Sequence, residues 1–202
     1  MIMVYADTLK HEDIPLVLFV GREPNDRREV GGWVGKYNFD GGKRKRRCAF
    51  WNTAYGLVAK TLDSGFTTKD VKAQSRIARS SVVAFADISP VSFLYSRHGK
   101  KKLREMVPKE RFETHADQIL NNSLMKRVRC IMISGSDRDG LKEQRESFES
   151  KAKDRGITCI RVPFLSGNTF PQVWNELVAD QKALSAIRDS TIEWADKAGL
   201  TK

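Results

Sequence analysis

Four short polar clusters each follow an apolar run of the sequence. They are Gly21-Arg22-Glu23-Pro24-Asn25, Asp87-Ile88-Ser89-Pro90, Ser134-Gly135-Ser136-Asp137 and Phe164-Leu165-Ser166-Gly167-Asn168. One such cluster alone is typical of an ordinary turn, because Gly, Ser, Asp and Pro all favour turns. As a set they include the carboxylates of Glu23 and Asp87. A carboxylate held in place can orient a water molecule and stabilise positive charge that develops on a substrate.

Two dense basic runs indicate a polyanionic partner. The chain carries a formal net charge of +11, and its cations gather at Lys43-Arg44-Lys45-Arg46-Arg47 and at Arg97-His98-Gly99-Lys100-Lys101-Lys102. A cationic surface attracts polyanions and releases counterions when it binds them. We therefore expect Lys43–Arg47, Lys100 and Lys101 to contact phosphates. The alternatives are a basic protein without such a partner, and a run 43–47 that is only the solvated start of a helix.

The elements that must position these clusters follow from the apolar pattern. Short apolar runs ended by turn residues predict buried strands over residues 16–20, 82–86, 128–133 and 157–162. Amphipathic spacing predicts helices over residues 50–61, 112–126, 141–155, 171–187 and 191–198. Gly156 suits a helix C-cap, and Pro171 suits a first helical turn. Alternating strands and helices predict one α/β domain over residues 1–202, a three-layer α/β/α sandwich with a central, mostly parallel four-stranded sheet.

One connection is too long for a simple sandwich. A segment of about 26 residues, 23–48, lies between the turn that ends the first strand and the first long helix, and it holds five glycines together with Trp33, Tyr37 and Phe39. Connections in such folds usually take roughly 2–6 residues, and longer ones tend to be functional. Ligands of open parallel sheets bind beyond the carboxyl ends of the strands, where this loop must emerge.

The first cluster resembles the first motif of the uracil-DNA glycosylase superfamily, which follows the first strand as Gly-x-(Asp or Asn)-Pro-x. Glu23 falls on the catalytic position of that motif, which orients or activates water. Leu165-Ser166-Gly167-Asn168 is similar to the second motif, which reads Asn-Pro-Ser-Gly in the mismatch-specific branch. Asp87 matches the place where many members carry an asparagine that reads the flipped base, and the strand ending in Ser134-Gly135 resembles the family's strand ending in a glycine turn.

The resemblance spans about residues 14–175. It implies a uracil-DNA glycosylase-like fold and a monofunctional DNA glycosylase that works by hydrolysis without a cofactor. The chain departs from the pattern in three respects. Glu23 is one methylene longer than the usual Asp or Asn, the late motif holds no histidine, and no cysteines cluster as in the iron–sulfur branches.

The residues themselves suit base excision. Breaking an N-glycosidic bond passes through an oxocarbenium-like sugar, which a carboxylate beneath the ring stabilises. We expect Glu23, with Asn25 beside it, to do this catalytic work and leave an abasic site. The target base must first flip into a pocket that stacks it on an aromatic ring. Trp33, Tyr37 and Phe39 are the expected platforms, with Phe50 and Trp51 as further candidates, although each aromatic is equally suited to the core.

Asp87 carries the expectation about the base. An ionised aspartate only accepts hydrogen bonds, so it prefers the exocyclic amine of a cytosine-type base to the edge of uracil. Some glycosylases of the superfamily attack hypermodified cytosines of viral DNA as a defence, and the glycine-rich loop leaves room for such a modification. The alternative is that Asp87 only caps a turn before Ser89 and Pro90.

The last cluster completes the expected DNA interface. We expect Ser166, Gly167 and Asn168 to grip the strand near the flipped nucleotide, and Leu165 or Phe170 to wedge into the vacated stack.

Two other functions remain open from sequence. A non-catalytic nucleic-acid-binding module needs only the basic and aromatic residues. A phosphate-binding loop over residues 134–140 ranks last, because it lacks the glycine-lysine-serine/threonine pattern. A lysine Schiff base is a further mechanistic alternative, although no single lysine is marked out.

Composition excludes several classes. The 202 residues suit a single core, and no apolar run is long enough to span a membrane. The opening Met1–Val4 is too short for a signal peptide, which favours a cytoplasmic protein. Cys48, Cys130 and Cys159 are far apart, a spacing that argues against a disulfide framework, a zinc site and an iron–sulfur cluster. We expect a monomer that binds DNA, without metal or cofactor.

Overall fold

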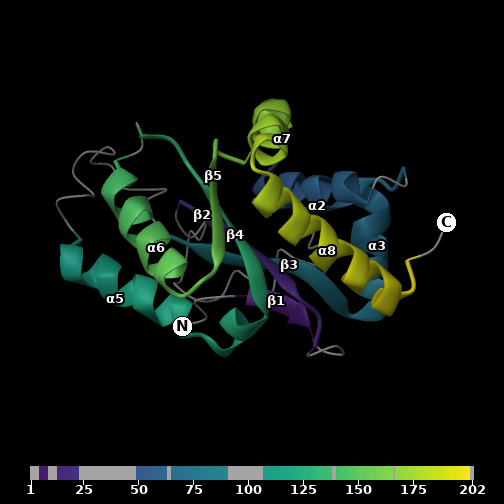
Figure 1. The fold of residues 1–202 in the computed structure, drawn as a ribbon, viewed down its shortest axis with the longest axis horizontal. Helices are drawn as coiled ribbons and strands as arrows, with labels where there is room; N and C mark the ends of the chain where they lie inside the picture. The colour runs from purple at the N-terminus through teal and green to yellow at the C-terminus, as the bar shows by residue number, and fades with distance from the viewer. Residues whose placement is uncertain are drawn as a thin grey trace, which may run out of the picture.

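The computed structural model describes residues 5–8, 13–22, 49–62, 65–90, 107–137, 140–165 and 167–200 (Figure 1). The strands are β1 (Tyr5–Thr8), β2 (Leu16–Gly21), β3 (Ser80–Asp87), β4 (Val128–Ser134) and β5 (Thr158–Val162). The α-helices are α2 (Ala49–Thr61), α3 (Thr68–Ala78), α5 (Lys109–Leu120), α6 (Lys142–Asp154), α7 (Phe170–Ala179) and α8 (Gln181–Ala198). Two short 3-10 helices, η1 (Ser123–Arg127) and η3 (Gly167–Thr169), precede β4 and α7.

The strands form one sheet in the order β1-β3-β2-β4-β5. β3, β2, β4 and β5 are parallel to one another, as the alternation of strands and helices predicted. The register pairs Phe19 with Phe85 on one side and with Met132 on the other. β1 adds an antiparallel fifth strand to β3 at the edge, which the sequence prediction of four strands did not include.

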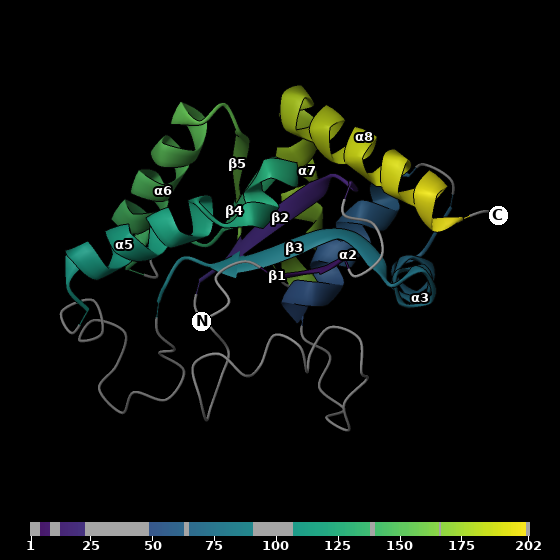
Figure 2. The same ribbon diagram turned by 90° about the horizontal axis from the view of Figure 1, so that it is seen from below.

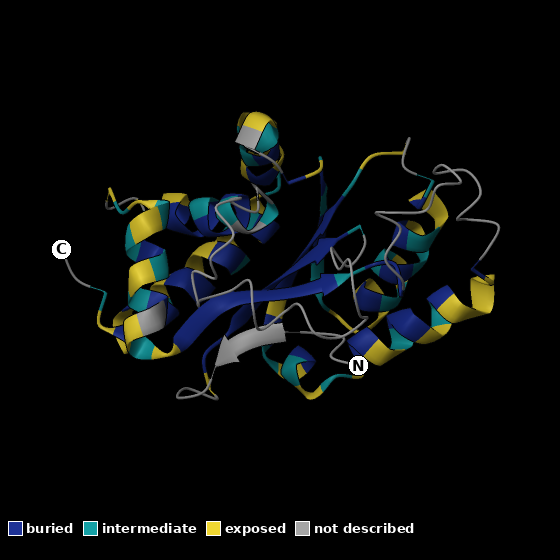
Figure 3. Cartoon of the chain, turned by 180° about the vertical axis from the view of Figure 1, so that it is seen from behind, coloured by how far each residue is buried: buried dark blue, intermediate teal, exposed yellow. Residues whose placement is uncertain are grey.

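Helices cover both faces of the parallel strands (Figures 1 and 2). Val17 and Phe19 of β2 point into a core cluster shared with α2, α3, α7 and α8. Leu16, Leu18 and Val20 point into a second cluster shared with α5 and α6. The central strands β2 and β3 are therefore buried on both sides, which explains their nearly continuous apolar sequence (Figure 3).

Two buried polar contacts fix the first of these faces. Trp194 of α8 is fully buried, and its Nε1 donates a hydrogen bond to the carbonyl oxygen of Ser80 at 3.2 Å. The hydroxyl of Tyr55 in α2 lies 3.3 Å from Ser81 Oγ. Both contacts reach the amino end of β3, so α2 and α8 are anchored to the same strand.

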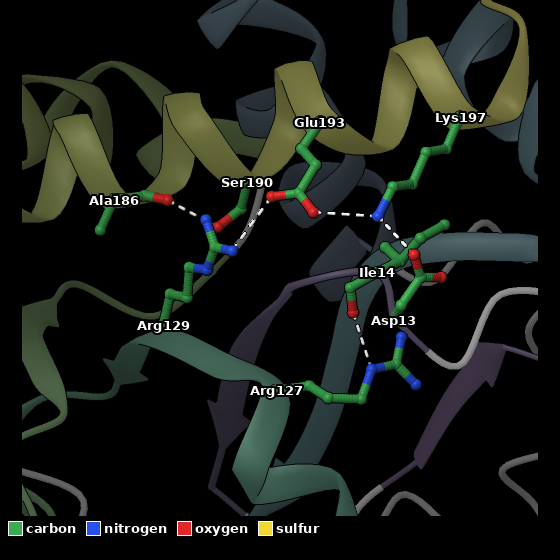
Figure 4. A network of polar contacts seen from close by, with 8 residues as sticks. All are labelled: Asp13, Ile14, Arg127, Arg129, Ala186, Ser190, Glu193 and Lys197. Carbon is green, nitrogen blue, oxygen red and sulfur yellow. Dashed lines mark hydrogen bonds and ion pairs between the residues drawn. The ribbon is translucent and has the colours of Figure 1, made fainter.

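A polar network joins α8 to the amino ends of β2 and β4 (Figure 4). Lys197 Nζ lies 2.6 Å from Asp13 Oδ2 and 3.1 Å from Glu193 Oε1, and Glu193 also accepts from Arg129 at 3.0 Å. Arg127 Nε donates to the carbonyl oxygen of Ile14 at 2.7 Å. Such exposed ion pairs each stabilise the fold little. Together they connect α8 to the amino-terminal edge of the sheet.

Local capping explains where the helices differ from the prediction. The predicted helix 171–187 is helical but not continuous. It is interrupted at Asp180, whose Oδ1 accepts from Ala183 N at 3.0 Å and caps the start of α8. The predicted break at residues 188–190 is absent, since α8 runs through it. The predicted helix 112–126 ends at Leu120, and Asn122 then caps η1 by accepting from Leu124 N.

One helix was not predicted. α3 begins with a capping box, in which Asp70 Oδ2 accepts from Thr67 N at 2.7 Å and Thr67 Oγ1 accepts from Asp70 N at 3.3 Å. Two other expectations are confirmed: Gly156 follows α6 with φ +76°, and Pro171 lies in the first turn of α7. No helix in the described part of the chain is long and apolar enough to cross a membrane.

Candidate functional site

The described starts of the four polar clusters meet at one edge of the sheet, because each cluster follows the end of one of four parallel strands. β2 ends at Gly21, β3 at Asp87, β4 at Ser134 and β5 at Val162, and these strands are parallel neighbours. In the described part of the chain, the next helix after β2 is α2, which packs on one face of the sheet, and the next helix after β4 is α6, which packs on the other face. The neighbouring ends of β2 and β4 are therefore a topological switch point, where open parallel sheets bind ligands.

Asp87 lies at this edge with its carboxylate over Gly21. A Cβ on Gly21 would stand 2.6 Å from Asp87 Oδ1 and 3.4 Å from Cζ of Phe50. Only a residue without a side chain leaves this space to the carboxylate and the ring. Asp87 itself is half-buried.

Phe50 supplies an aromatic ring beside that carboxylate. It lies in the first turn of α2 and remains half-buried. Its ring packs against Phe85 with centroids 5.8 Å apart and planes at 53°, which fixes it to the core. Of the aromatic residues expected to stack a base, Phe50 is the one whose position beside Asp87 is described.

The strand ends are held together by hydrogen bonds that continue past the regular ladder. Ile88 N donates to the carbonyl oxygen of Gly21 at 2.9 Å, and Ser89 N donates to that of Arg22 at 3.1 Å. On the other side of β2, Ser134 Oγ donates to the carbonyl oxygen of Val20 at 3.0 Å. Asp87 is thus carried by a rigid segment, whose residues Ile88 to Pro90 are buried.

His115 supports Asp87 from the other face of the sheet. It is 6% exposed in α5, and its Nε2 lies 2.8 Å from the carbonyl oxygen of Asp87. Burial lowers the pKa of His115 below its ordinary value; the hydrogen bond to Asp87 opposes this shift in part, and the nearby positive charge of Arg111 adds to it. His115 was not singled out from sequence. The available signal was its place on the apolar face of an amphipathic helix, three residues after Phe112 and four before Ile119.

Arg145 is a second residue that the sequence analysis missed. It lies in α6 and is 3% exposed, and its Nη2 donates to the carbonyl oxygen of Ser136 at 2.6 Å. A Cβ on Gly135 would stand 2.8 Å from Arg145 Cζ, so the guanidinium occupies the space above that glycine. The turn after β4 is therefore built around a buried cation at the carboxyl edge of the sheet.

The cluster at residues 164–168 is described except for Ser166. Gly167–Thr169 form η3 between β5 and α7, and Asn168 is exposed. The prediction that Leu165 wedges into DNA is wrong, because Leu165 is fully buried in the core. Phe170, the other predicted wedge, packs against that core, with Cε2 3.1 Å from a Cβ placed on Gly56 of α2.

The remaining predicted site residues lie outside the described residues or have no described side chain. Those outside are Glu23, Asn25, Trp33, Tyr37, Phe39, Lys43, Arg44, Lys45, Arg46, Arg47, Lys100, Lys101 and Ser166. The side chain of Trp51 is likewise not described.

The two described cysteines have the chemistry of core thiols. Burial raises the pKa of Cys159 to about 12 and raises that of Cys130 as well. Cys130 points into the first core cluster and Cys159 into the second, on opposite faces of the sheet. Among the described residues, no group of three or more His, Cys, Asp and Glu side chains is arranged to hold a metal ion.

The chain matches no protein-family model and no curated protein sequence.

Proposed function

We propose that this protein is a DNA glycosylase with a uracil-DNA glycosylase-like fold, which flips a base and hydrolyses its N-glycosidic bond. The observation that carries the proposal is the half-buried carboxylate of Asp87, held over Gly21 and beside Phe50 at the carboxyl edge of a parallel sheet. A pocket for a flipped base needs an aromatic surface and a polar group that reads the pairing edge. Phe50 and Asp87 supply one of each.

Glu23 is the proposed catalytic carboxylate. It follows Arg22 directly in the sequence, and Arg22 accepts the last hydrogen bond from the Asp87–Ser89 segment. In the proposed reaction Glu23 orients a water molecule and takes its proton, with Asn25 beside it. The water oxygen bonds to C1′ of the sugar while the bond from C1′ to the base nitrogen breaks. The base leaves with the electron pair, and an abasic site remains.

The base is proposed to be a cytosine derivative, because the ionised Asp87 carboxylate accepts but does not donate hydrogen bonds. A hypermodified cytosine of foreign DNA is the candidate of this kind that the superfamily resemblance suggests. Binding of the strand is assigned to Lys43–Arg47, Lys100 and Lys101, with the exposed Asn168 of η3, Ser166 and Gly167 close to the flipped nucleotide.

The test is base release from matched DNA duplexes that differ at one position, detected as cleavage of the resulting abasic site by alkali. We expect release of a modified cytosine. Glu23→Gln should slow release at least about a hundredfold, in line with the loss of one preorganised electrostatic group. DNA binding should change little, since the neutral isostere removes no phosphate contact.

This experiment also separates the enzyme from a non-catalytic DNA-binding module. A module of that kind would bind the duplexes and leave every base in place. Near-normal release by Glu23→Gln would instead keep the enzyme and move its chemistry to another residue.

A further inference from the structure

We infer that His115 is a positioning residue, which fixes the base-reading carboxylate of Asp87 by donating a hydrogen bond to the Asp87 carbonyl oxygen. This inference rests on the proposed function of the site. It adds a residue from α5 and from the opposite face of the sheet, which has no part in the proposed contacts with the base or the strand.

The side-chain carboxylate and the backbone carbonyl of Asp87 make contacts on opposite faces of the sheet. Phe85 points into the cluster with α2, whereas Ala86 and Ile88 point into the cluster with α5. Because side chains alternate along a strand, the Asp87 carboxylate lies on the α2 side, where it meets Gly21 and Phe50. The carbonyl oxygen of the same residue meets His115 Nε2 at 2.8 Å.

The chemistry of this contact fixes the state of the imidazole. A carbonyl oxygen only accepts, so Nε2 must carry the proton, and the neutral ring then leaves Nδ1 without one. Nδ1 is buried, and no hydrogen-bond partner for it is found among the described residues. Burial also holds the pKa of His115 down, which keeps the ring in this neutral form. Burying an imidazole without hydrogen bonds is unfavourable, and the bond from Nε2 to Asp87 is the hydrogen bond that the structure shows for this ring.

The bond acts on the segment that sets the direction of the carboxylate. The peptide unit between Asp87 and Ile88 accepts from His115 through its oxygen and donates to Gly21 O through its nitrogen, at 2.9 Å. With both groups bonded, the unit cannot rotate without losing a hydrogen bond. Discriminating one base edge from another requires placement within about 0.5 Å, so a fixed peptide at this point favours selective base reading.

The test compares three substitutions of His115. His115→Gln keeps a donor, because its amide nitrogen lies near the place of the ring Nε2. His115→Leu removes the donor at similar volume, and His115→Asn carries an amide too short to reach the carbonyl, so it replaces the leucine variant if that one does not fold. Glu110→Gln, on the exposed side of α5, is the matched control.

Two readouts are measured on each protein. The first is amide hydrogen exchange of Ile88 and Ser89, which needs no substrate. We expect exchange about tenfold faster in His115→Leu, as for the loss of one hydrogen bond, and near-native exchange in His115→Gln. The second is single-turnover release of a modified cytosine, which should fall at least about tenfold in His115→Leu and be largely restored in His115→Gln. The dissociation constant for DNA should stay within about twofold in all variants, because the buried His115 makes no phosphate contact of its own.

The outcomes that overturn the inference differ from those that overturn the proposed function. Native release by His115→Leu shows that the hydrogen bond does not position Asp87. Equal loss in His115→Gln and His115→Leu shows that ring packing, and not the donor, is required. If the native protein releases no base from any duplex, the proposed function is wrong and the positioning role falls with it.

Discussion

The Oδ1 atom of Asp87 lies 2.6 Å from the point where a Cβ on Gly21 would stand. Real Cβ atoms do not approach an oxygen this closely, so the observed position of the Asp87 carboxylate requires glycine at position 21. Gly21 and Asp87 are also register partners in the parallel ladder between β2 and β3. The absence of a side chain at Gly21 therefore leaves the space that the Asp87 carboxylate of β3 occupies.

Gly21→Ala should displace Asp87 and impair both stability and base release. The added methyl overlaps Oδ1 and contacts the Phe50 ring at 3.4 Å, and overpacking of this kind costs roughly 1–3 kcal/mol. The free energy of unfolding from urea titration measures the first effect, and single-turnover release measures the second. Because the clash is with the carboxylate, Asp87→Ala should relieve much of it. Additive effects of the two substitutions in a double-mutant cycle would contradict this account.

Asp87→Asn should change which base is released. The native carboxylate accepts from an exocyclic amine, so a modified cytosine should be processed and uracil refused. The amide can present either a donor or an acceptor, which should relax or invert the choice. A mismatched edge leaves a buried polar group unpaired at about 1–3 kcal/mol, enough for roughly ten- to a hundredfold discrimination. Single-turnover rates on the two bases in one sequence context provide the measurement. Efficient uracil release by the native protein would leave Asp87 as a turn residue.

Neutralising the basic run 43–47 should weaken DNA binding regardless of sequence. Replacing Lys43, Arg44, Lys45, Arg46 and Arg47 with glutamine removes counterion release at each phosphate they contact. The slope of log affinity against log salt should fall by about one unit per contact. Titrations of labelled duplex at several salt concentrations measure this slope. If the slope does not change, the run lies away from the nucleic acid.

Much of the fold was predictable because the strands are buried on both faces. The apolar runs at residues 16–20, 82–86 and 128–133 stand out from the polar turns around them, and their positions were correct to within two residues. β1 was missed, because Tyr5–Thr8 is too short and too polar to show an apolar run. The helix break at Asp180 was missed because its cap depends on one side-chain hydrogen bond to Ala183 N.

The site was predictable only where it follows strand ends. Parallel strands bring their carboxyl ends together, so the position of Asp87 followed from the strand pattern alone. His115 and Arg145 could not be found this way, because each reaches the edge from a helix and not from a strand end. In the sequence they resemble any polar residue of an amphipathic helix, and only the packing of α5 and α6 brings them to a backbone carbonyl.

The buried state of His115 predicts how stability depends on pH. Burial, with the charge of Arg111, lowers the pKa of His115 in the folded protein, whereas in the unfolded chain it stays near 6.5. Just below that pH, His115 is protonated in the unfolded chain but remains neutral in the folded protein. The contribution of His115 to stability is therefore complete above about pH 6.5 and is lost as the pH falls below it.

His115→Gln isolates this effect, because glutamine does not titrate. The chain has three histidines, and the other two, His11 and His98, are common to both proteins, so their titration cancels in the comparison. Urea unfolding of the native protein and of His115→Gln should give a difference in free energy that is constant above about pH 7. Toward pH 5 the native protein should lose stability relative to the variant, with a slope of at most about 1.4 kcal/mol per pH unit for one proton. A difference that stays constant over the whole range would show that His115 titrates alike in the folded and unfolded states, and hence that it is not held as a buried neutral donor to Asp87.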